Sequence, residues 1–362
     1  MKKITINNKE IVLTRNMIFS IICMILLIAF VIIGNFTLND YISRILNNCA
    51  IYTVLGLSMN LINGFTGLFS LGHAGFMAIG AYVTALLTMT LESKAKIFYM
   101  SPLIFPFNKI AIPLIFALII AGLITALFAF LIGAPVLRLR GDYLAIATLG
   151  FAEIIRVVVT NTQNITNGAL GIKEVPRSAN MIWTFSIAIF TTIIMILLIK
   201  SSYGKALKAI REDEVAAEAM GINLFKHKLL AFIIGAFFAG VGGGLLASIL
   251  GTVNPTMFKF TITFNILLII VLGGMGSITG TIISAFIVTI GQEWLRFLDS
   301  PMNLGFMTIN LPGLRMVIFS LILVIVVIFF RRGIMGSNEF SWDYLFDFLF
   351  KKFKYKPLKK GE

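Results

Sequence analysis

Long apolar runs, separated by short polar segments, follow one another along most of the chain. They lie at 17–34, 44–63, 70–90, 112–136, 143–160, 181–199, 228–250, 261–276, 280–298 and 314–330. A helix needs about 20 apolar residues to cross a hydrocarbon core of about 30 Å, and most of these runs approach that length. The pattern predicts an all-α polytopic membrane protein with about ten transmembrane helices.

Basic residues gather in some of the polar segments and are sparse in others. The clusters lie at 2–15, at Arg138 and Arg140, at 200–228, and at Arg331 and Arg332. An even number of predicted helices separates each cluster from the next, so all four can face the cytoplasm, where Lys and Arg accumulate. We expect a cytoplasmic N-terminal segment at 1–16, a transmembrane domain at 17–336 and a basic cytoplasmic tail at 337–362. Both termini would then be cytoplasmic.

Glycine-rich breaks interrupt the apolar pattern twice. The first break, 63–75, reads NGFTGLFSLGHAG, and the second break, 273–280, reads GGMGSITG. Non-helical backbone is tolerated at membrane depth where protein buries it or where it lines a cavity. Both breaks are therefore candidates for a translocation pathway, the alternative being helix ends and packing surfaces of small residues. A third glycine run, 240–244, is interpreted as a helix-packing surface.

Composition agrees with a membrane protein. The chain is 58% hydrophobic and 13% charged, whereas globular chains average about 45–50% and about 25%. The formal charge of +14 lies mainly in short loops and at the ends, which argues for membrane topology and contact with anionic lipid rather than nucleic-acid binding. Two cysteines, Cys23 and Cys49, indicate neither a disulfide framework nor a cysteine-rich metal site.

The polar segment 201–227 differs from the other loops because it is charged and helix-forming. It predicts one short helix over Ala206–Ile210 and a second that opens at Asp213 or Glu214 and stops at Gly221. Acidic residues near that second N-terminus suit the helix dipole, and Ala216, Ala217 and Ala219 would leave a small-residue face. The segment is either a docking site for a soluble partner or a solvated charged loop.

Four motifs together resemble the family of branched-chain amino acid ABC transporter permeases, and in particular its M-type subunit. They are GKALKAIREDEVAAEAMGI at 204–222, SMNL with GFTGLFSLGHA at 58–74, GDYLAIATLGFAEIIR at 141–156, and VLGGMGS at 271–277. The resemblance spans roughly residues 50 to 336. It implies an ABC importer permease of the bacterial inner membrane that carries leucine, isoleucine and valine.

The resemblance also implies partners. They are a second homologous permease subunit that completes a heterodimer, two cytoplasmic ATPase subunits and an external substrate-binding protein. This chain has no G-x-x-x-x-G-K-[ST] phosphate loop, so we expect no enzyme activity and no cofactor here, with ATP and Mg bound on the ATPase subunits. Transport would proceed by alternating access, driven through the segment 201–227.

Two groups of site residues follow from this interpretation. We expect coupling to the ATPases through Gly204, Arg211, Glu212, Asp213, Glu214, Ala216, Ala217 and Gly221. We expect the translocation pathway near Asn60, Thr66, Ser70, Gly72, His73, Gly273, Gly274 and Ser277.

Ionisable groups within predicted spans are costly and therefore functional candidates. Glu153 with Arg156, and Glu293 with Arg296, have the i,i+3 spacing at which side chains meet on one helix face. Their alternative role is mutual neutralisation. His73 is expected to bond to freed backbone in the first break rather than to contact substrate or relay protons. No spacing of ligands supports a metal site, and no triad supports catalysis.

Rival functions remain open at this point. The permease could serve nucleosides, sugars or other small polar solutes. It could instead be an ion-coupled secondary transporter, in which Glu153, Arg156 and His73 relay ions or protons. A membrane enzyme would need a cluster of nucleophiles and metal ligands that the sequence does not offer.

Overall fold

The computed structural model describes most of the chain up to Arg296 and scattered residues beyond it. The described residues are 2–6, 9–13, 15–99, 101–139, 141–296, 302–303, 308–309, 314, 317–318, 320–321, 324, 333–336 and 339. Most of the predicted run at 314–330 and most of the tail at 337–362 therefore lie outside the described residues.

The protein is almost entirely helical, as the sequence predicts. The long helices are α1 (Arg15–Thr37), α2 (Asp40–Met59), α3 (His73–Thr88), α5 (Leu114–Val136), α6 (Asp142–Asn161), α8 (Met181–Lys200), α11 (Leu224–Leu250), α12 (Phe260–Gly273) and α13 (Ile278–Trp294). Shorter pieces are the π-helix η1 (Asn60–Phe65), α4 (Leu91–Ile97), α7 (Gln163–Thr166), η2 (Gly168–Leu170), α9 (Ser202–Glu212), α10 (Glu214–Ala219) and η3 (Pro255–Phe258). Two small hairpins pair β1 (Lys2–Ile6) with β2 (Lys9–Leu13), and β3 (Met302–Asn303) with β4 (Thr308–Ile309).

The number of spanning helices is not confirmed at ten. Within the described residues, five helices are long and apolar enough to cross a membrane, or six if the pair α3–α4, bent by 118°, is one span. Two further apolar segments are Ile22–Thr37, which is part of the 23-residue helix α1, and Phe260–Gly273, which is shorter than a full span. This count covers only the described residues, and most of the predicted run at 314–330 lies outside them, so ten spans stays a prediction.

The core consists of α2, α3 and α11, with α5 packed beside them. Glycines let these backbones approach closely: a Cβ on Gly80 of α3 would lie 2.0 Å from the carbonyl oxygen of Gly240 in α11. A Cβ on Gly243 would likewise lie 2.2 Å from the carbonyl oxygen of Met77. The run 240–244 is thus a helix-packing surface of the small-residue kind common in membranes, and that prediction is confirmed.

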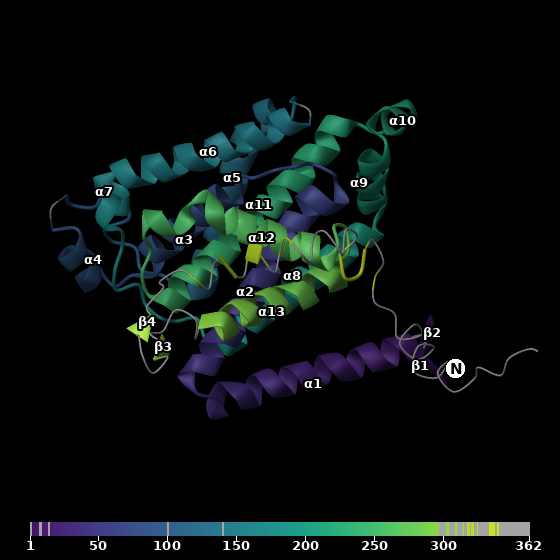
Figure 1. The fold of residues 1–362 in the computed structure, drawn as a ribbon, viewed down its shortest axis with the longest axis horizontal. Coiled ribbons are helices and arrows are strands. Elements are labelled where there is room, and N and C mark those ends of the chain that lie inside the picture. Colours follow the sequence, from purple (N-terminus) through teal and green to yellow (C-terminus); the bar gives the residue numbers. More distant parts are fainter. Residues whose placement is uncertain are drawn as a thin grey trace, which may run out of the picture.

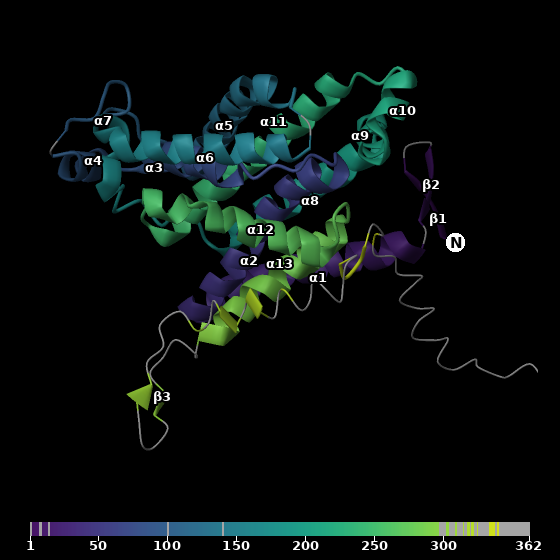
Figure 2. The same ribbon diagram turned by 45° about the horizontal axis from the view of Figure 1, so that its top comes forward.

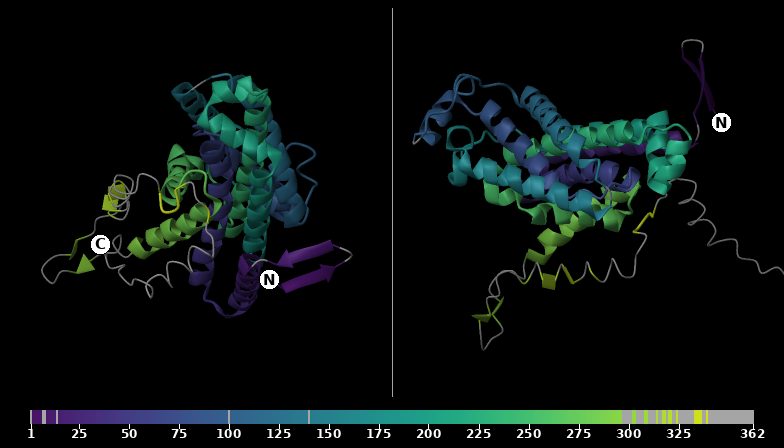
Figure 3. Two further views of the ribbon diagram at one scale, coloured as in Figure 1. Left: turned by 90° about the vertical axis from the view of Figure 1, so that its right-hand side faces the viewer. Right: turned by 90° about the horizontal axis from the view of Figure 1, so that it is seen from above.

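Other helices lie at the outside of the bundle. The apolar window of the α2–η1 span is 78% buried, whereas that of α6 is 28% buried. In Figures 1 and 2, α6 lies above α12 and α13, and in Figure 1 α1 runs along the lower edge. The β1–β2 hairpin projects from the helices (Figure 3), and α9 and α10 lie at the same end of the helix bundle as this hairpin (Figure 1).

Candidate functional site

The first break is a π-helix followed by non-helical backbone. Thr66 donates its hydroxyl to the carbonyl of Leu61 at 2.8 Å. The Asn63 side chain donates to the carbonyl of Ser70 at 3.1 Å and accepts from the Ser70 amide at 3.3 Å. Side chains thus replace the helical bonds that this buried segment lacks, as irregular backbone in a membrane requires.

The second break separates α12 from α13. Gly274 and Gly276 have φ of +108° and +91°, which side chains rarely tolerate. Ser277 caps α13 by accepting the amide of Gly280 at 3.1 Å. The interruption predicted at 273–280 is therefore present.

Residues 334, 335 and 339, near the C-terminus, form hydrogen bonds with both sides of the second break. The amides of Ile334 and Met335 donate to the carbonyls of Leu272 and Gly273 at 2.8 and 3.1 Å. The Glu339 carboxylate accepts the amides of the first two residues of α13 at 2.7 and 3.0 Å. An anion at a helix N-terminus is stabilised by the dipole and by the free amides.

Asn60 joins the two breaks. Its Oδ1 accepts the amide of Gly276 at 2.9 Å, and its Nδ2 donates to the carbonyl of Ser277 at 2.9 Å and to the hydroxyl of Thr281 at 2.8 Å. Asn60 has no exposed surface. Gly64 must lack a side chain here, since its Cβ would lie 1.8 Å from Asn60 Oδ1. The geometry makes Asn60 a structural bridge.

His73 begins α3 at the end of the first break. Its Nε2 lies 3.0 Å from the hydroxyl of Ser58 on α2, and Ser58 in turn donates to the carbonyl of Leu55 at 2.7 Å. The His73 ring is completely buried, and its Nδ1 has no hydrogen-bond partner among the described residues. The ring thus bonds to a side chain, not to freed backbone.

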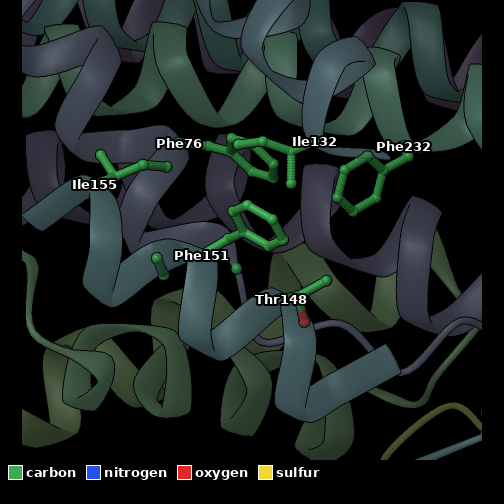
Figure 4. Close-up of a pocket in the computed structure, with 8 residues that line it drawn as sticks. Phe76, Ile132, Thr148, Phe151, Ile155 and Phe232 are labelled. Carbon is green, nitrogen blue, oxygen red and sulfur yellow. The ribbon is translucent and has the colours of Figure 1, made fainter. Parts of the chain in front are cut away.

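A small apolar pocket lies between α6 and the core, next to the first break. Its walls are Gly72, Phe76, Ile132, Thr148, Phe151, Ala152, Ile155 and Phe232. Figure 4 shows Phe76, Phe151 and Phe232 gathered around it, with the Thr148 hydroxyl at one side. Of the predicted pathway residues Gly72 alone lines this pocket, while Asn60, Thr66, Ser70 and His73 are buried within the chain.

The segment 201–227 forms the two helices that the sequence predicts. α9 extends past the expected piece at both ends, and Asp213 caps α10 by accepting the amides of Val215 and Ala216 at 2.8 and 3.0 Å. Gly221 follows α10 with φ of +83°. Glu214 accepts a hydrogen bond from Lys228 of α11 at 2.6 Å, which ties α10 to the long helix behind it.

The predicted coupling residues point in two directions. Glu212, Asp213, Ala216 and Gly221 are exposed, whereas Ala217 is buried and Gly204 packs against the carbonyl of Ile199. Beside the exposed residues, the side chains of Val215 and Met220 are 74% and 82% exposed. One side of α10 thus belongs to the fold, and the other is open.

Arg211 points into the fold. Its Nη1 donates to the carbonyl of Gly64 in the first break at 3.2 Å, and its Nε donates to Glu212 at 3.1 Å. A Cβ on Gly67 or on Gly276 would lie 2.9 or 2.5 Å from Arg211 atoms. One guanidinium from α9 therefore lies against both breaks.

Both predicted charge pairs form. Arg156 Nε and Glu153 Oε2 are 2.7 Å apart in α6, and Arg296 Nη1 and Glu293 Oε2 are 3.6 Å apart at the end of α13. Within the described residues, no group of three His, Cys, Asp or Glu side chains is placed to hold a metal ion.

Sequence reasoning missed several partners in this site. Ser58 lies in a quoted motif, two residues before Asn60, but its contact with His73 crosses between helices. For the Lys228–Glu214 pair, the sequence offered only the opposite charges of two residues in and beside the segment 201–227. Glu339 had no local signal, because its partners are about 60 residues away in the chain.

Comparisons with known proteins agree with the earlier resemblance. A family model described as branched-chain amino acid transport system / permease component matches residues 41–327. The high-affinity branched-chain amino acid transport system permease proteins LivM of Salmonella typhimurium strain LT2 and Escherichia coli strain K12 are each 35% identical over 280 residues, covering 68% of this chain and 61% of theirs. The chain thus matches less than two thirds of the length of these two relatives.

A second kind of relative also matches. The probable branched-chain amino acid transport permease protein LivH of Methanocaldococcus jannaschii is 25% identical over 314 residues, covering 81% of this chain and 90% of its own. No solved structure matches the chain significantly.

Proposed function

Because the chain belongs to the family of branched-chain amino acid transport permease components, we propose that it is the membrane-spanning subunit of an ATP-driven importer for leucine, isoleucine and valine. The family match over 41–327 carries this proposal, since it includes both breaks and the whole of α9 and α10. The names of the LivM and LivH relatives favour branched-chain amino acids over nucleosides or sugars.

The complex would contain a second, homologous permease subunit, two cytoplasmic ATPases and an external binding protein. Two kinds of permease relative match this one chain, which supports a homologous second subunit. ATP and Mg would bind to the ATPases, since this sequence lacks a phosphate-binding loop. The family and the apolar helices make the chain a multi-pass membrane protein. We place it in the bacterial cytoplasmic membrane with both termini in the cytoplasm.

In this mechanism α9 and α10 receive the movement of the ATPases. The exposed side of α10, with Val215 and Met220, offers apolar contact area, and Glu212 and Asp213 offer charge. Movement of α9 displaces Arg211, whose guanidinium holds the carbonyl of Gly64. The first break would then transmit the displacement to the second break through Asn60. Alternating access would follow if the polar groups of the two breaks formed a different set of hydrogen bonds in a second conformation.

Reconstitution tests the proposal. The chain, its second permease subunit and the ATPases would be placed in liposomes, and uptake of radiolabelled leucine, isoleucine and valine measured with and without ATP and the binding protein. We expect uptake that requires both. A matched complex with an ATPase that binds but does not hydrolyse ATP should show only background uptake.

Other outcomes assign other functions. Uptake of nucleosides or sugars alone would replace the substrate and keep the importer. Uptake by this chain alone, abolished by an ionophore and indifferent to ATP, would make it a secondary transporter and overturn the proposal.

A further inference from the structure

The helices at the outside of the bundle differ in whether they contain ionisable residues. α5 contains no ionisable residue, and in α8 the single one is the terminal Lys200. Their exposed side chains, such as Phe130 and Phe190, are apolar, as a surface against lipid requires. α6 instead carries Glu153 and Arg156, whose side chains remain 32% and 28% exposed.

This ion pair lies deep along the helix. Glu153 follows Asp142, the first residue of α6, by about 11 residues, or about 17 Å at about 1.5 Å per residue. That distance is more than half the thickness of a hydrocarbon core of about 30 Å. Charged groups at such depth face protein or a water-filled cavity, not lipid. The Glu293–Arg296 pair differs because it lies at the very end of α13.

The helix that carries the pair borders the first break. The amide of Leu71 donates to Thr148 of α6 at 3.0 Å, and the amide of Ala74 donates to Thr263 of α12 at 3.0 Å. The start of α3 is therefore bonded to α6 on one side and to α12 on the other, and Figures 1 and 2 show these helices side by side. We call the exposed sides of these two helices, with Ile146, Glu153, Arg156, Phe260 and Phe264, the α6–α12 face.

We propose that the α6–α12 face is the contact surface for the second permease subunit, with the Glu153–Arg156 pair on the seam between the two. This proposal rests on the proposed function. Glu153 lies about 17 Å from the start of α6 and about 12 Å from its end. Soluble ATPases on one side and a binding protein on the other cannot reach that depth, so the occupant must itself span the membrane. Phe260 and Phe264, 48% and 46% exposed, supply apolar contact area on the same face. The seam would then run beside the first break, which contains predicted pathway residues.

Crosslinking in the assembled complex tests this placement. A photo-crosslinking amino acid replaces Ile146, which is 67% exposed and lies two helical turns before Glu153. Matched controls carry it at Phe130 of α5 or Phe190 of α8, which are 47% and 58% exposed. We expect a crosslink to the second permease subunit from Ile146 at least tenfold stronger than from either control. Stronger crosslinking from a control, or a crosslink from Ile146 to a second copy of this chain or to lipid alone, overturns the placement.

A pair of substitutions tests the role of the charges. Arg156→Gln leaves Glu153 unpaired at the seam and should reduce recovery of the second subunit by at least fivefold, whereas Arg296→Gln at the end of α13 should not. Equal recovery from both variants would refute a role for the pair at the interface. If no second permease subunit is recovered even with the unaltered chain, the proposed function fails; if it is recovered but crosslinks elsewhere, only this inference fails.

Discussion

Replacing Asn60 by alanine is expected to detach the two breaks from each other. The Asn60 side chain makes three hydrogen bonds across the junction, to Gly276, Ser277 and Thr281, and none of its surface is exposed. Water therefore cannot replace the bonds once the side chain is removed. The Gly276 amide would be the group most affected, because it donates to Asn60 Oδ1.

The size of the effect follows from these contacts. A buried donor left without a partner costs about 1–3 kcal/mol, and each of the other two bonds contributes about 0.5–1.5 kcal/mol. The sum is a loss of about 2–6 kcal/mol in the free energy of unfolding. Asn60→Asp keeps the shape and the acceptor for Gly276 but loses both donated bonds and buries a charge, so it should be at least as destabilising.

The measurement is reversible unfolding in mixed micelles titrated with a denaturing detergent. Asn161→Ala provides the control, because Asn161 is also a helical asparagine that donates a bond, to Val157, but it is exposed at the end of α6. We expect that control to stay within about 0.5 kcal/mol of the unaltered protein. A loss below about 1 kcal/mol for Asn60→Ala would refute the reasoning, because the junction would then not depend on this bridge.

Three further predictions concern other contacts of the same unit. Arg211→Gln should lower ATP-dependent uptake at least tenfold without changing the amount of ATPase that co-purifies, and a parallel loss of both would make Arg211 a docking residue instead. Glu339→Gln replaces the carboxylate at the α13 N-terminus by a neutral amide and should lower the free energy of unfolding by about 0.3–1 kcal/mol. An unchanged free energy of unfolding would show that the negative charge contributes nothing there. Gly80→Ala should destabilise by about 3 kcal/mol, since its Cβ meets backbone at 2.0 Å. Gly150→Ala, with nothing within 4 Å of its Cβ, should not destabilise, and equal effects from the two glycines would contradict the close helix contact.

Local patterns were enough to predict the helices and their interruptions. Apolar runs place nine of the predicted spans on helices, because hydrophobic length is a property of each segment alone. Asp213 was one of two residues expected to open α10, and it is the cap, since a carboxylate next to free amides is a local arrangement. The count of ten spans stays a prediction, because most of the run at 314–330 lies outside the described residues and hydropathy does not say whether the bent pair α3–α4 is one span.

Contacts between distant segments could not be predicted from those patterns. Asn60 meets residues more than 200 positions away, and the sequence around it does not say which glycine it will bond. The exposed and buried sides of α10 are set by how α10 packs against α9 and α11, so Ala216 and Ala217 look alike in sequence but differ in exposure. Arg211 likewise reads as a surface charge until α9 is placed beside Gly64.

The two breaks and α9 behave as one unit because their polar groups satisfy one another. Arg211 holds the Gly64 carbonyl, Asn60 holds the Gly276 amide, and Gly64 and Gly276 lack the side chains that would separate these groups. A buried backbone group left without a partner is costly, which opposes a gradual movement of α9 away from Gly64. Each stable arrangement must give these groups partners, which favours a small number of discrete states over continuous deformation. Such switching between discrete states is what alternating access requires of the junction between α9 and the two breaks.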